Sequence, residues 1–374
     1  MIMETPVRAS PVRASPVRAS PVRASPVRAS PVRASPVLAG PVLADFSLPP
    51  ELEAHEPPEA RGIARAGVRM LVSRRHTGEI SHHRFTELPG LLLPGDLLVV
   101  NISATLPAAV ACEPGLAVHF STPLPDGSWL AELRARRGPA TVRHSGGFPG
   151  QELTLPGGAV LKLGARVTGR LWRVRLSTAV PPYLLRHGTA IRYSYVDRAW
   201  PIEAYQTVFA SQPGSAEMPS ASRPFTAEMV TRLVAGGITF APLTLHTGVS
   251  SLEGDEEPYP EPYDVPPATA RLVELTRRSG GRVIAAGTTV VRALETTARL
   301  PGAAGAGWTG HIVTPAGRLL AVDGLLTGLH EPRSSHLLML GAFADPDLLR
   351  RCYDAAARQR YLWHEFGDVH LLLP

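Results

Sequence analysis

The stretch GGRVIAAGTTVVRALE, residues 280–295, decides how the rest of the chain is arranged. Residues 282–286 are an apolar run between glycines, which predicts a strand buried on both faces, as in a parallel sheet. The valines and leucine that follow recur at helical spacing, so a helix is expected next, with Thr288 or Thr289 as its side-chain cap. Gly287 separates the two elements.

This turn is a candidate ligand site. Gly287 stands at the carboxyl end of the predicted strand, where open α/β sheets bind ligands and where the N–H groups of a helix start can hold a carboxylate or a hydroxyl. Arg292 and Glu295 follow one helical spacing apart, so both could face one site. The alternative is an ordinary turn, with Arg292 and Glu295 forming only a helix salt bridge.

Alternating helix and strand patterns lead into this stretch. Residues 226–235 predict a helix that Thr226 caps, residues 238–246 predict a strand, and Pro267 begins the next helix. Two successive helix-to-strand units indicate an α/β fold with a mainly parallel open sheet and helices. Further upstream, residues 70–85 predict a β-hairpin.

Residues 108–180 show a different pattern from the segments before and after them. Residues 108–180 contain short strands at close spacing with Gly and Pro between them, which is typical of a small antiparallel β-barrel. We therefore expect an inserted β-barrel domain at 108–180 and an α/β catalytic domain made of 45–107 and 181–374.

The first 44 residues are repetitive. Residues 6–35 are six copies of PVRAS, and a proline in every copy excludes a helix or a central strand. We expect a disordered tail, which is either a neutral repeat or mis-assigned start, or an RNA-binding arm.

Composition limits the class of protein. Of the 374 residues, 44% are hydrophobic, which is enough for a sizeable core, and no apolar run reaches the roughly 20 residues that span a bilayer. The only two cysteines, Cys112 and Cys352, have no partner at metal-ligand spacing. A soluble protein of a reducing compartment is expected.

The net charge of +6 is unevenly distributed. The tail holds six arginines and one glutamate, and residues 108–180 hold nine basic and four acidic residues. The insert is therefore the part of the folded chain best suited to a polyanion such as RNA. The same charges could equally form a solvated face.

Seven segments resemble, in order and spacing, the S-adenosylmethionine:tRNA ribosyltransferase-isomerase family of the queuosine pathway. They are DFSLPPELEAHEPPEAR (45–61), PGDLLVVN (94–101), YQTVFA (205–210), TLHTG (244–248), the 280–295 stretch, VDGLLTGLHEPRSSHLLMLGAF (322–343) and FGD (366–368). The resemblance covers residues 45–374 and implies the same layout of an α/β domain with an inserted barrel.

The resemblance also implies a reaction. In this family S-adenosylmethionine is a co-substrate that donates its ribosyl group to the aminomethyl nitrogen of a 7-deazaguanine in tRNA; adenine and methionine leave, and an epoxycyclopentanediol remains. Such chemistry needs a base, donors for the departing adenine and anchors for the methionine group. No prosthetic group or metal is implied, and a cytoplasmic monomer that contacts tRNA through the insert is expected.

The family's motif residues carry over to positions of this sequence. As hypotheses, His246 or His330 is the general base, Arg333 or Arg292 pairs with the methionine carboxylate, and the Thr288–Thr289 turn contacts ribose or carboxylate. The predicted catalytic residues are His246, His330 and Asp323. The predicted substrate-binding residues are Asn101, Tyr205, Gln206, Thr207, Gly248, Gly287, Thr288, Thr289, Arg292, Glu295, Thr327, Arg333, Ser334 and Asp368. A core or cap hydrogen bond is the alternative role for either histidine.

Four segments depart from the family pattern. Residues 101–104 are NISA where the family has Asn-Asp-Thr-Arg, Pro224 replaces a histidine, Glu256 and Tyr259 replace two histidines, and Gly328 replaces an asparagine. Three interpretations stay open: the family reaction, a divergent paralogue that uses S-adenosylmethionine with another acceptor, and a non-catalytic relative that binds S-adenosylmethionine or RNA.

Overall fold

The fold is that of a computed structural model. It describes residues 46–112, 115–137, 140–250, 259–300, 302, 304–331 and 334–374. The predicted tail, Glu256 and Arg333 lie outside the described residues. Everything below concerns the unit from residue 46 onward.

The 280–295 stretch forms the predicted strand and helix. Strand β15 (Val283–Ala286) is buried along its whole length, and helix α4 (Thr288–Thr297) follows directly. The predicted threonine cap is wrong, because Gly287 is the N-cap and no side chain caps the helix. Gly287 has φ of 107°, a conformation that residues with a Cβ rarely adopt, so the turn depends on glycine.

Strand β15 lies near the middle of a nine-stranded sheet with the order β16-β14-β13-β3-β15-β17-β18-β1-β2. The hairpin predicted at residues 70–85 is confirmed as β1 and β2. The strands other than β15 are β1 (Arg69–Arg74), β2 (Ile80–Arg84), β3 (Leu97–Asn101), β13 (Thr239–Leu245), β14 (Glu261–Val265), β16 (Gly305–Thr309), β17 (Gly324–Gly328) and β18 (Val369–Leu373).

The sheet is mixed, which corrects the prediction of a mainly parallel sheet. Four neighbouring pairs are parallel, including the central run β13-β3-β15-β17. The other four pairs are antiparallel: β14 and β16 at one edge, β18 against β17, and the β1–β2 hairpin. The α/β class with helices is confirmed, and the central parallel run is the part that the helix–strand alternation predicted.

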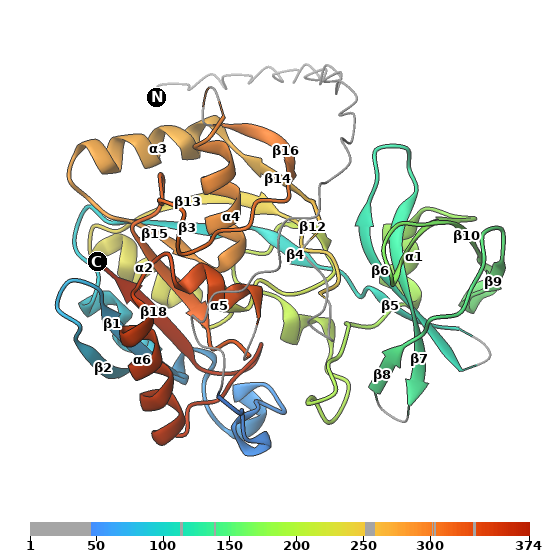
Figure 1. Cartoon of the computed structure of the whole chain (residues 1–374), viewed down its shortest axis with the longest axis horizontal. Helices are drawn as coiled ribbons and strands as arrows, with labels where there is room; N and C mark the ends of the chain where they lie inside the picture. Colours follow the sequence, from blue (N-terminus) through green and yellow to red (C-terminus); the bar gives the residue numbers. More distant parts are fainter. Residues whose placement is uncertain are drawn as a thin grey trace, which may run out of the picture. The chain divides into compact units, whose positions relative to one another are not determined.

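Both faces of the central strands are covered, as the apolar runs required. In β3, Leu97 and Val99 belong to one apolar cluster, whereas Leu98 and Val100 belong to another on the opposite face. Side chains of α4, α5 and α6 contribute to the first cluster and side chains of α2 to the second. Figure 1 shows these helices around the sheet. The helices are α2 (Ala227–Ala235), α3 (Pro267–Arg278), α5 (Ser335–Leu340) and α6 (Pro346–Arg358).

The insert forms a separate, nearly closed antiparallel sheet with the order β5-β6-β7-β11-β10-β9, and β8 pairs with β7. Its two ends approach each other where the Cys112 thiol contacts the Thr154 carbonyl at 3.6 Å. The prediction of a small antiparallel β-barrel is confirmed as a nearly closed, barrel-like sheet. The strands are β5 (Ala109–Cys112), β6 (Leu116–Pro123), β7 (Trp129–Arg137), β8 (Ala140–Arg143), β9 (Glu152–Thr154), β10 (Val160–Arg166) and β11 (Leu171–Leu176).

Helix α1 (Val180–His187) closes the barrel sheet and returns the chain to the α/β part. Its buried Tyr183 and Leu184 share an apolar cluster with the barrel strands. The domain boundaries predicted at 107/108 and 180/181 stay a prediction. Within the described residues, no helix combines the length and apolar character needed to cross a membrane.

Candidate active site

The polar residues of interest gather where the parallel strands end. The carboxyl ends of β3, β13, β15 and β17 lie at one edge of the sheet, because these strands are parallel neighbours. Four predicted site residues lie at this edge: Asn101 ends β3, His246 follows β13, Gly287 follows β15, and Thr327 is the second-last residue of β17. The strand order therefore brings these four residues to one edge of the sheet, and their predicted roles stay predictions.

Asn101 connects β3 to the end of β13 and to the start of α4 through hydrogen bonds. Its Nδ2 donates to the Leu245 carbonyl at 2.8 Å and to Thr289 Oγ1 at 3.2 Å. Its Oδ1 accepts from the Leu245 and Ser103 N–H groups at 3.1 and 3.0 Å. The side chain is fully buried, and all its polar atoms are engaged. Asn101 therefore orients β13 and the start of α4, and the predicted direct contact with substrate has no support in this geometry.

His246 is held by two serines. Its Nδ1 lies 2.7 Å from Ser103 Oγ, which lies 2.6 Å from Ser215 Oγ. Ser103 and Ser215 come from β4 (Ser103–Thr105) and β12 (Gln212–Ser215), which pair in parallel. Burial lowers the pKa of His246, so its imidazole is neutral at pH 7. A neutral imidazole with one nitrogen fixed by a hydroxyl is suited to accept a proton.

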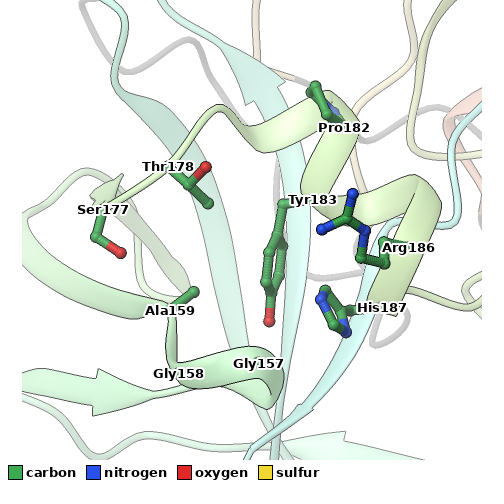
Figure 2. A pocket seen from close by; sticks show the side chains of 9 residues that line it. All are labelled: Gly157, Gly158, Ala159, Ser177, Thr178, Pro182, Tyr183, Arg186 and His187. Carbon is green, nitrogen blue, oxygen red and sulfur yellow. The ribbon is translucent and has the colours of Figure 1, made fainter.

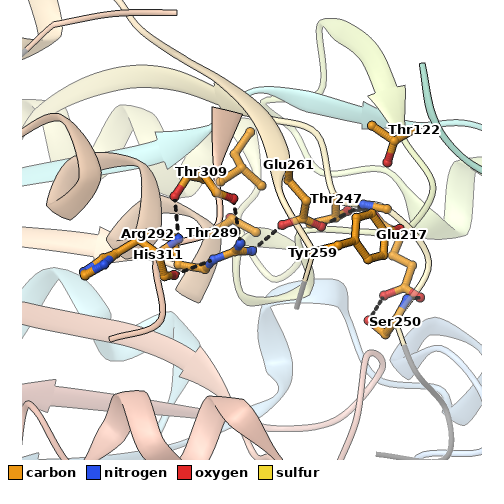
Figure 3. Close-up of polar contacts among 12 residues, drawn as sticks. Thr122, Glu217, Thr247, Ser250, Tyr259, Glu261, Thr289, Arg292, Thr309 and His311 are labelled. Atoms are coloured by element: carbon orange, nitrogen blue, oxygen red, sulfur yellow. Dashed lines mark hydrogen bonds and ion pairs between the residues drawn. The ribbon is translucent and has the colours of Figure 1, made fainter. Parts of the chain in front are cut away.

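Arg292 reaches β14 and β16, away from Glu295. Its guanidinium pairs with Glu261 and donates to the carbonyls of Thr309 and His311 at 3.2 and 3.3 Å (Figure 3). These contacts occupy the groups that a methionine carboxylate would need. The role predicted for Arg292 stays a prediction, and the structure favours a positioning role for it.

Glu261 connects Arg292 to the loop after His246. Its second oxygen accepts the Gly248 N–H at 2.8 Å. Burial raises the pKa of Glu261, while the Arg292 guanidinium opposes that change. The ion pair fixes the 246–249 loop relative to α4, because one carboxylate binds both.

Gly248 has no space for a side chain. A Cβ there would overlap the Tyr259 hydroxyl and Ser121 Oγ, which bond to each other. We expect Gly248→Ala to displace Tyr259 and the 246–249 loop, and to lower turnover about 10- to 100-fold through misplacement of His246. Steady-state kinetics with Gly90→Ala as control tests this, since Gly90 has open space around it and no positive φ. Equal turnover in Gly248→Ala and wild type would contradict it.

Glu295 points to a different loop. Fully buried, it accepts the N–H groups of Leu320, Ala321 and Val322 at 2.9–3.2 Å and pairs with Arg299 at 2.6 Å. The expectation that Arg292 and Glu295 face one site is therefore wrong. Arg292 binds β14 and the end of β16, whereas Glu295 binds the 320–322 loop.

Asp323 and Asp368 both hold the backbone. Asp323 accepts the Val283 N–H at 2.9 Å, at the amino ends of β15 and β17, which is the sheet edge opposite Gly287. Asp368 binds the N–H and guanidinium of Arg69 and the Leu362 N–H. The catalytic role predicted for Asp323 and the binding role predicted for Asp368 stay untested, and neither placement favours them.

His330 lies in a partly buried group of histidines. Its Nε2 is 2.7 Å from Thr327 Oγ1, and its ring stacks on His336 at 4.5 Å and 8°. Burial, with the neighbouring histidines, lowers the pKa of His330 well below its usual value, and burial lowers the pKa of His336 to about 4. Nearby Ser334 has a buried Oγ that lacks a partner among the described residues. His330 stays a candidate base.

The segment from Tyr205 to Thr207 supports β4. Gln206 donates to and accepts from the backbone of Thr105, at 2.8 and 3.0 Å. Thr207 is buried, and its Oγ1 accepts the Phe209 N–H at 3.3 Å. Tyr205 is also buried, but its hydroxyl has no partner among the described residues. Gln206 therefore holds β4, the strand that carries Ser103. The Tyr205 hydroxyl, by contrast, is available for a hydrogen bond.

Comparison with known proteins agrees with the motifs at this edge. A family model described as queuosine biosynthesis protein matches residues 43–372. The chain belongs to the queuosine biosynthesis protein family. Its relatives include S-adenosylmethionine:tRNA ribosyltransferase-isomerases of Chlorobium phaeovibrioides (36% identical over 347 residues) and Thermotoga maritima (33% over 347), and each alignment covers 88% of this chain and 98% of the relative.

A solved structure resembles the fold as well. The crystal structure of the S-adenosylmethionine tRNA ribosyltransferase of T. maritima matches with a TM-score of 0.52 at 30% identity, over 88% of this chain and 99% of that one. The queuosine biosynthesis family layout of a mixed sheet with a barrel-like insert is therefore shared.

The departures from the family pattern have structural counterparts. Ser103 stands where the family motif has threonine, so the hydroxyl that contacts His246 is kept although Ile102 and Ala104 replace an aspartate and an arginine. Tyr259, in place of a histidine, bonds to Ser121 of the barrel sheet. This hydrogen bond joins the barrel sheet to the segment before β14.

Three polar residues of this site were not predicted: Ser215, Glu217 and Glu261. A signal existed for Glu261, because alternation along β14 places it on the same side as the buried Tyr263 and Val265. A carboxylate on an apolar side needs a partner, and Arg292 is that partner. Nothing local distinguishes Ser215 or Glu217 from ordinary loop residues.

A cavity lies on the insert, away from the sheet edge described above. A cavity of about 380 Å³ opens between α1 and the turn after β9, lined by Gly157, Gly158, Ser177, Tyr183, Arg186 and His187. Figure 2 shows His187 projecting from α1 toward Gly157, with Arg186 beside Tyr183. Its lining residues include two basic side chains and no carboxylate. Among the described residues, no group of three or more His, Cys, Asp or Glu is arranged to hold a metal ion.

Proposed function

We propose that this protein transfers and isomerises the ribosyl group of S-adenosylmethionine onto 7-aminomethyl-7-deazaguanine in tRNA, giving epoxyqueuosine, adenine and methionine. The observation that carries the proposal is the similarity over nearly the full length of relatives with this activity in their name. The Ser103–His246 contact and the Gly287 turn support it, since both lie at the carboxyl edge of the parallel strands, where α/β sheets bind ligands.

We assign a separate role in this reaction to each part of the site. His246 takes a proton from the attacking amine or from the carbon next to sulfur, because its imidazole is neutral and fixed by Ser103. The free N–H groups of the α4 start, at Thr288 and Thr289, bind ribose hydroxyls or the methionine carboxylate. Arg292 and Glu261 hold the loop that carries His246.

Release of adenine and methionine tests this function. The chain is incubated with S-adenosylmethionine and tRNA that carries the aminomethyl-deazaguanine, and both products are quantified by chromatography. We expect stoichiometric release that depends on the tRNA. Absence of release, with the T. maritima relative active in parallel, would contradict the proposal.

A second candidate follows from the rewritten acceptor side. Ile102, Ala104 and Tyr259 replace ionisable family residues, which favours a paralogue that uses another acceptor. Release with a different acceptor, but not with the aminomethyl-deazaguanine tRNA, would support that candidate. Binding of S-adenosylmethionine without release from any acceptor would support a non-catalytic relative.

We propose further that tRNA binds through the insert and that the enzyme acts as a cytoplasmic monomer. Much of the insert's positive charge is internally neutralised: Glu132 pairs with Arg134 and Arg170, and Asp126 with Arg173 and Arg175. The exposed end of β7, at Arg136 and Arg137, and the Arg186 cavity are the remaining candidates for phosphate contacts.

Replacing Arg136 and Arg137 with alanine together should weaken tRNA binding. Each lost phosphate contact lowers the slope of log affinity against log salt by about 1, so the double variant should lose about 2. Filter binding over a salt series measures this, with Arg278→Ala on α3 as control. Unchanged affinity and slope in the double variant would place the tRNA elsewhere.

A further inference from the structure

Three aromatic rings stack beside the loop that precedes β18. The rings of Tyr193 and Tyr195 lie 5.5 Å apart at an angle of 9°, and His364 lies 3.9 Å from Tyr195 at 11°. The histidine is held between Glu53 and Glu331, each at 3.3 Å. Electron-rich tyrosine faces near carboxylates attract positively charged groups.

Two more carboxylates lie at the edge of this stack. Glu217 accepts a hydrogen bond from the Tyr193 hydroxyl and two from Ser250, at 2.7 and 2.8 Å. Glu365 follows His364, and the Tyr195 hydroxyl bonds to its backbone. Glu365 Oε1 is out of contact with solvent and has no hydrogen-bond partner among the described residues.

The Tyr205 hydroxyl is an independent sign of an incomplete site. The side chain is only 2% exposed, and its hydroxyl has no partner in the described part of the chain. Burial and then the charge of Glu365 raise the pKa of Tyr205, so the two groups lie near each other. Two unsatisfied buried oxygens cost several kcal/mol, about 1–3 each, and such groups are characteristic of binding sites.

We propose that Glu217, Glu365 and the Tyr193–Tyr195 stack form a subsite for an organic cation. The inference rests on the proposed function, which supplies two sources of this chemistry: the ammonium and sulfonium groups of S-adenosylmethionine, and the aminomethyl group of the acceptor base. A cation placed here contacts both carboxylates and an aromatic face, and the neighbouring Glu261 adds to the negative field around Glu217.

Binding at this subsite releases a proton. Burial, and then Glu217, raise the pKa of Glu365 to about 8, while Arg223 opposes that change. Glu365 is therefore largely protonated at pH 7 and ionises when a cation binds, so cation affinity rises as pH rises through about 8. The titratable or charged groups that face Glu365 are Glu217, Tyr193, Tyr195, Tyr205 and Arg223.

The test is calorimetric titration of the full chain at pH 8.5 with two series of probes. The first series is S-adenosylmethionine, S-adenosylhomocysteine, which lacks the sulfonium charge, and methylthioadenosine, which lacks the ammonium as well. The second is 7-aminomethyl-7-deazaguanine and its 7-cyano counterpart, which has no amine. The variants are Glu365→Gln and Glu217→Gln, and Glu274→Gln on α3 is the matched control.

Both variants should lower the affinity for one cationic probe about 10- to 100-fold. Their affinity for the counterpart that lacks this cationic group should stay within about twofold of the wild-type value. If only the affinity for S-adenosylmethionine falls, the subsite binds the sulfonium group. If the affinity for S-adenosylhomocysteine falls as well, the subsite binds the ammonium group. Weakening of the aminomethyl base alone identifies the acceptor. At pH 7, in buffers of different ionisation enthalpy, the wild type should release up to one proton with that probe and Glu365→Gln none.

Unaltered affinity of both folded variants for every cationic probe would overturn the inference. If the wild type still releases adenine from S-adenosylmethionine in that case, the proposed function stands without this subsite. A wild type that binds neither S-adenosylmethionine nor the aminomethyl base would instead overturn the proposed function, and the inference with it.

Discussion

Glu295→Gln lowers the free energy of unfolding by about 3 kcal/mol or more and the melting temperature by about 5–10 °C. The Glu295 carboxylate accepts three successive N–H groups of residues 320–322 and the Arg299 guanidinium, with no exposure to solvent. A glutamine amide nitrogen cannot accept these bonds, and Arg299 loses its carboxylate partner while keeping its bonds to the Glu295 and Arg318 carbonyls. Differential scanning calorimetry measures the change.

The matched control is Glu274→Gln on α3. Glu274 is exposed and forms one ion pair, with Arg278 at 3.7 Å, so its replacement should change stability by less than about 0.5 kcal/mol. Because Glu295 supports a loop far from His246, Glu295→Gln should keep its turnover below the melting temperature. A melting temperature equal to that of wild type would show that the carboxylate does not hold the 320–322 loop.

His246→Gln should lower the turnover number about 10²- to 10⁴-fold while S-adenosylmethionine binding is kept. The imidazole is fixed by Ser103 at 2.7 Å, and glutamine preserves a polar side chain without a proton-accepting ring. Ser103→Ala, which removes only the orienting hydroxyl, should have a smaller effect. Single-turnover measurement of adenine release separates the chemical step from product release.

The pH profile gives an independent check on His246. Burial lowers its pKa below the usual 6.5, so the base is free at neutral pH and activity falls as pH drops through that lowered pKa. The residual activity of His246→Gln should lack this acidic limb. His83→Gln, on the exposed β2 strand, serves as control. Wild-type turnover in His246→Gln would remove it from the mechanism and leave His330 as the candidate base.

The local structure of the central stretch could be predicted from its own residues. The apolar run required burial on both faces, and β15 is buried along its length. The threonine cap could not be excluded, because the left-handed conformation of Gly287, which makes the glycine itself the N-cap, is a property of the fold. The direction of the strands could not be predicted either, since β18 pairs with β17 through residues more than forty positions apart.

The site was predictable where motifs end strands and unpredictable where partners are distant. Asn101, His246 and Gly287 meet at one edge because their strands are parallel neighbours. Arg292 and Glu295 diverge, since their partners come from β14 and from the 320–322 loop. Glu217 and Glu365 stood out only after the fold placed them beside the tyrosine stack.

The most direct test of the central claim is the fate of the acceptor nucleoside. tRNA that carries 7-aminomethyl-7-deazaguanosine is incubated with the protein and S-adenosylmethionine, digested, and analysed by liquid chromatography and mass spectrometry. The proposed function predicts that this nucleoside disappears and that epoxyqueuosine appears in equal amount. An unchanged nucleoside, under conditions in which the T. maritima relative converts it, would contradict the claim.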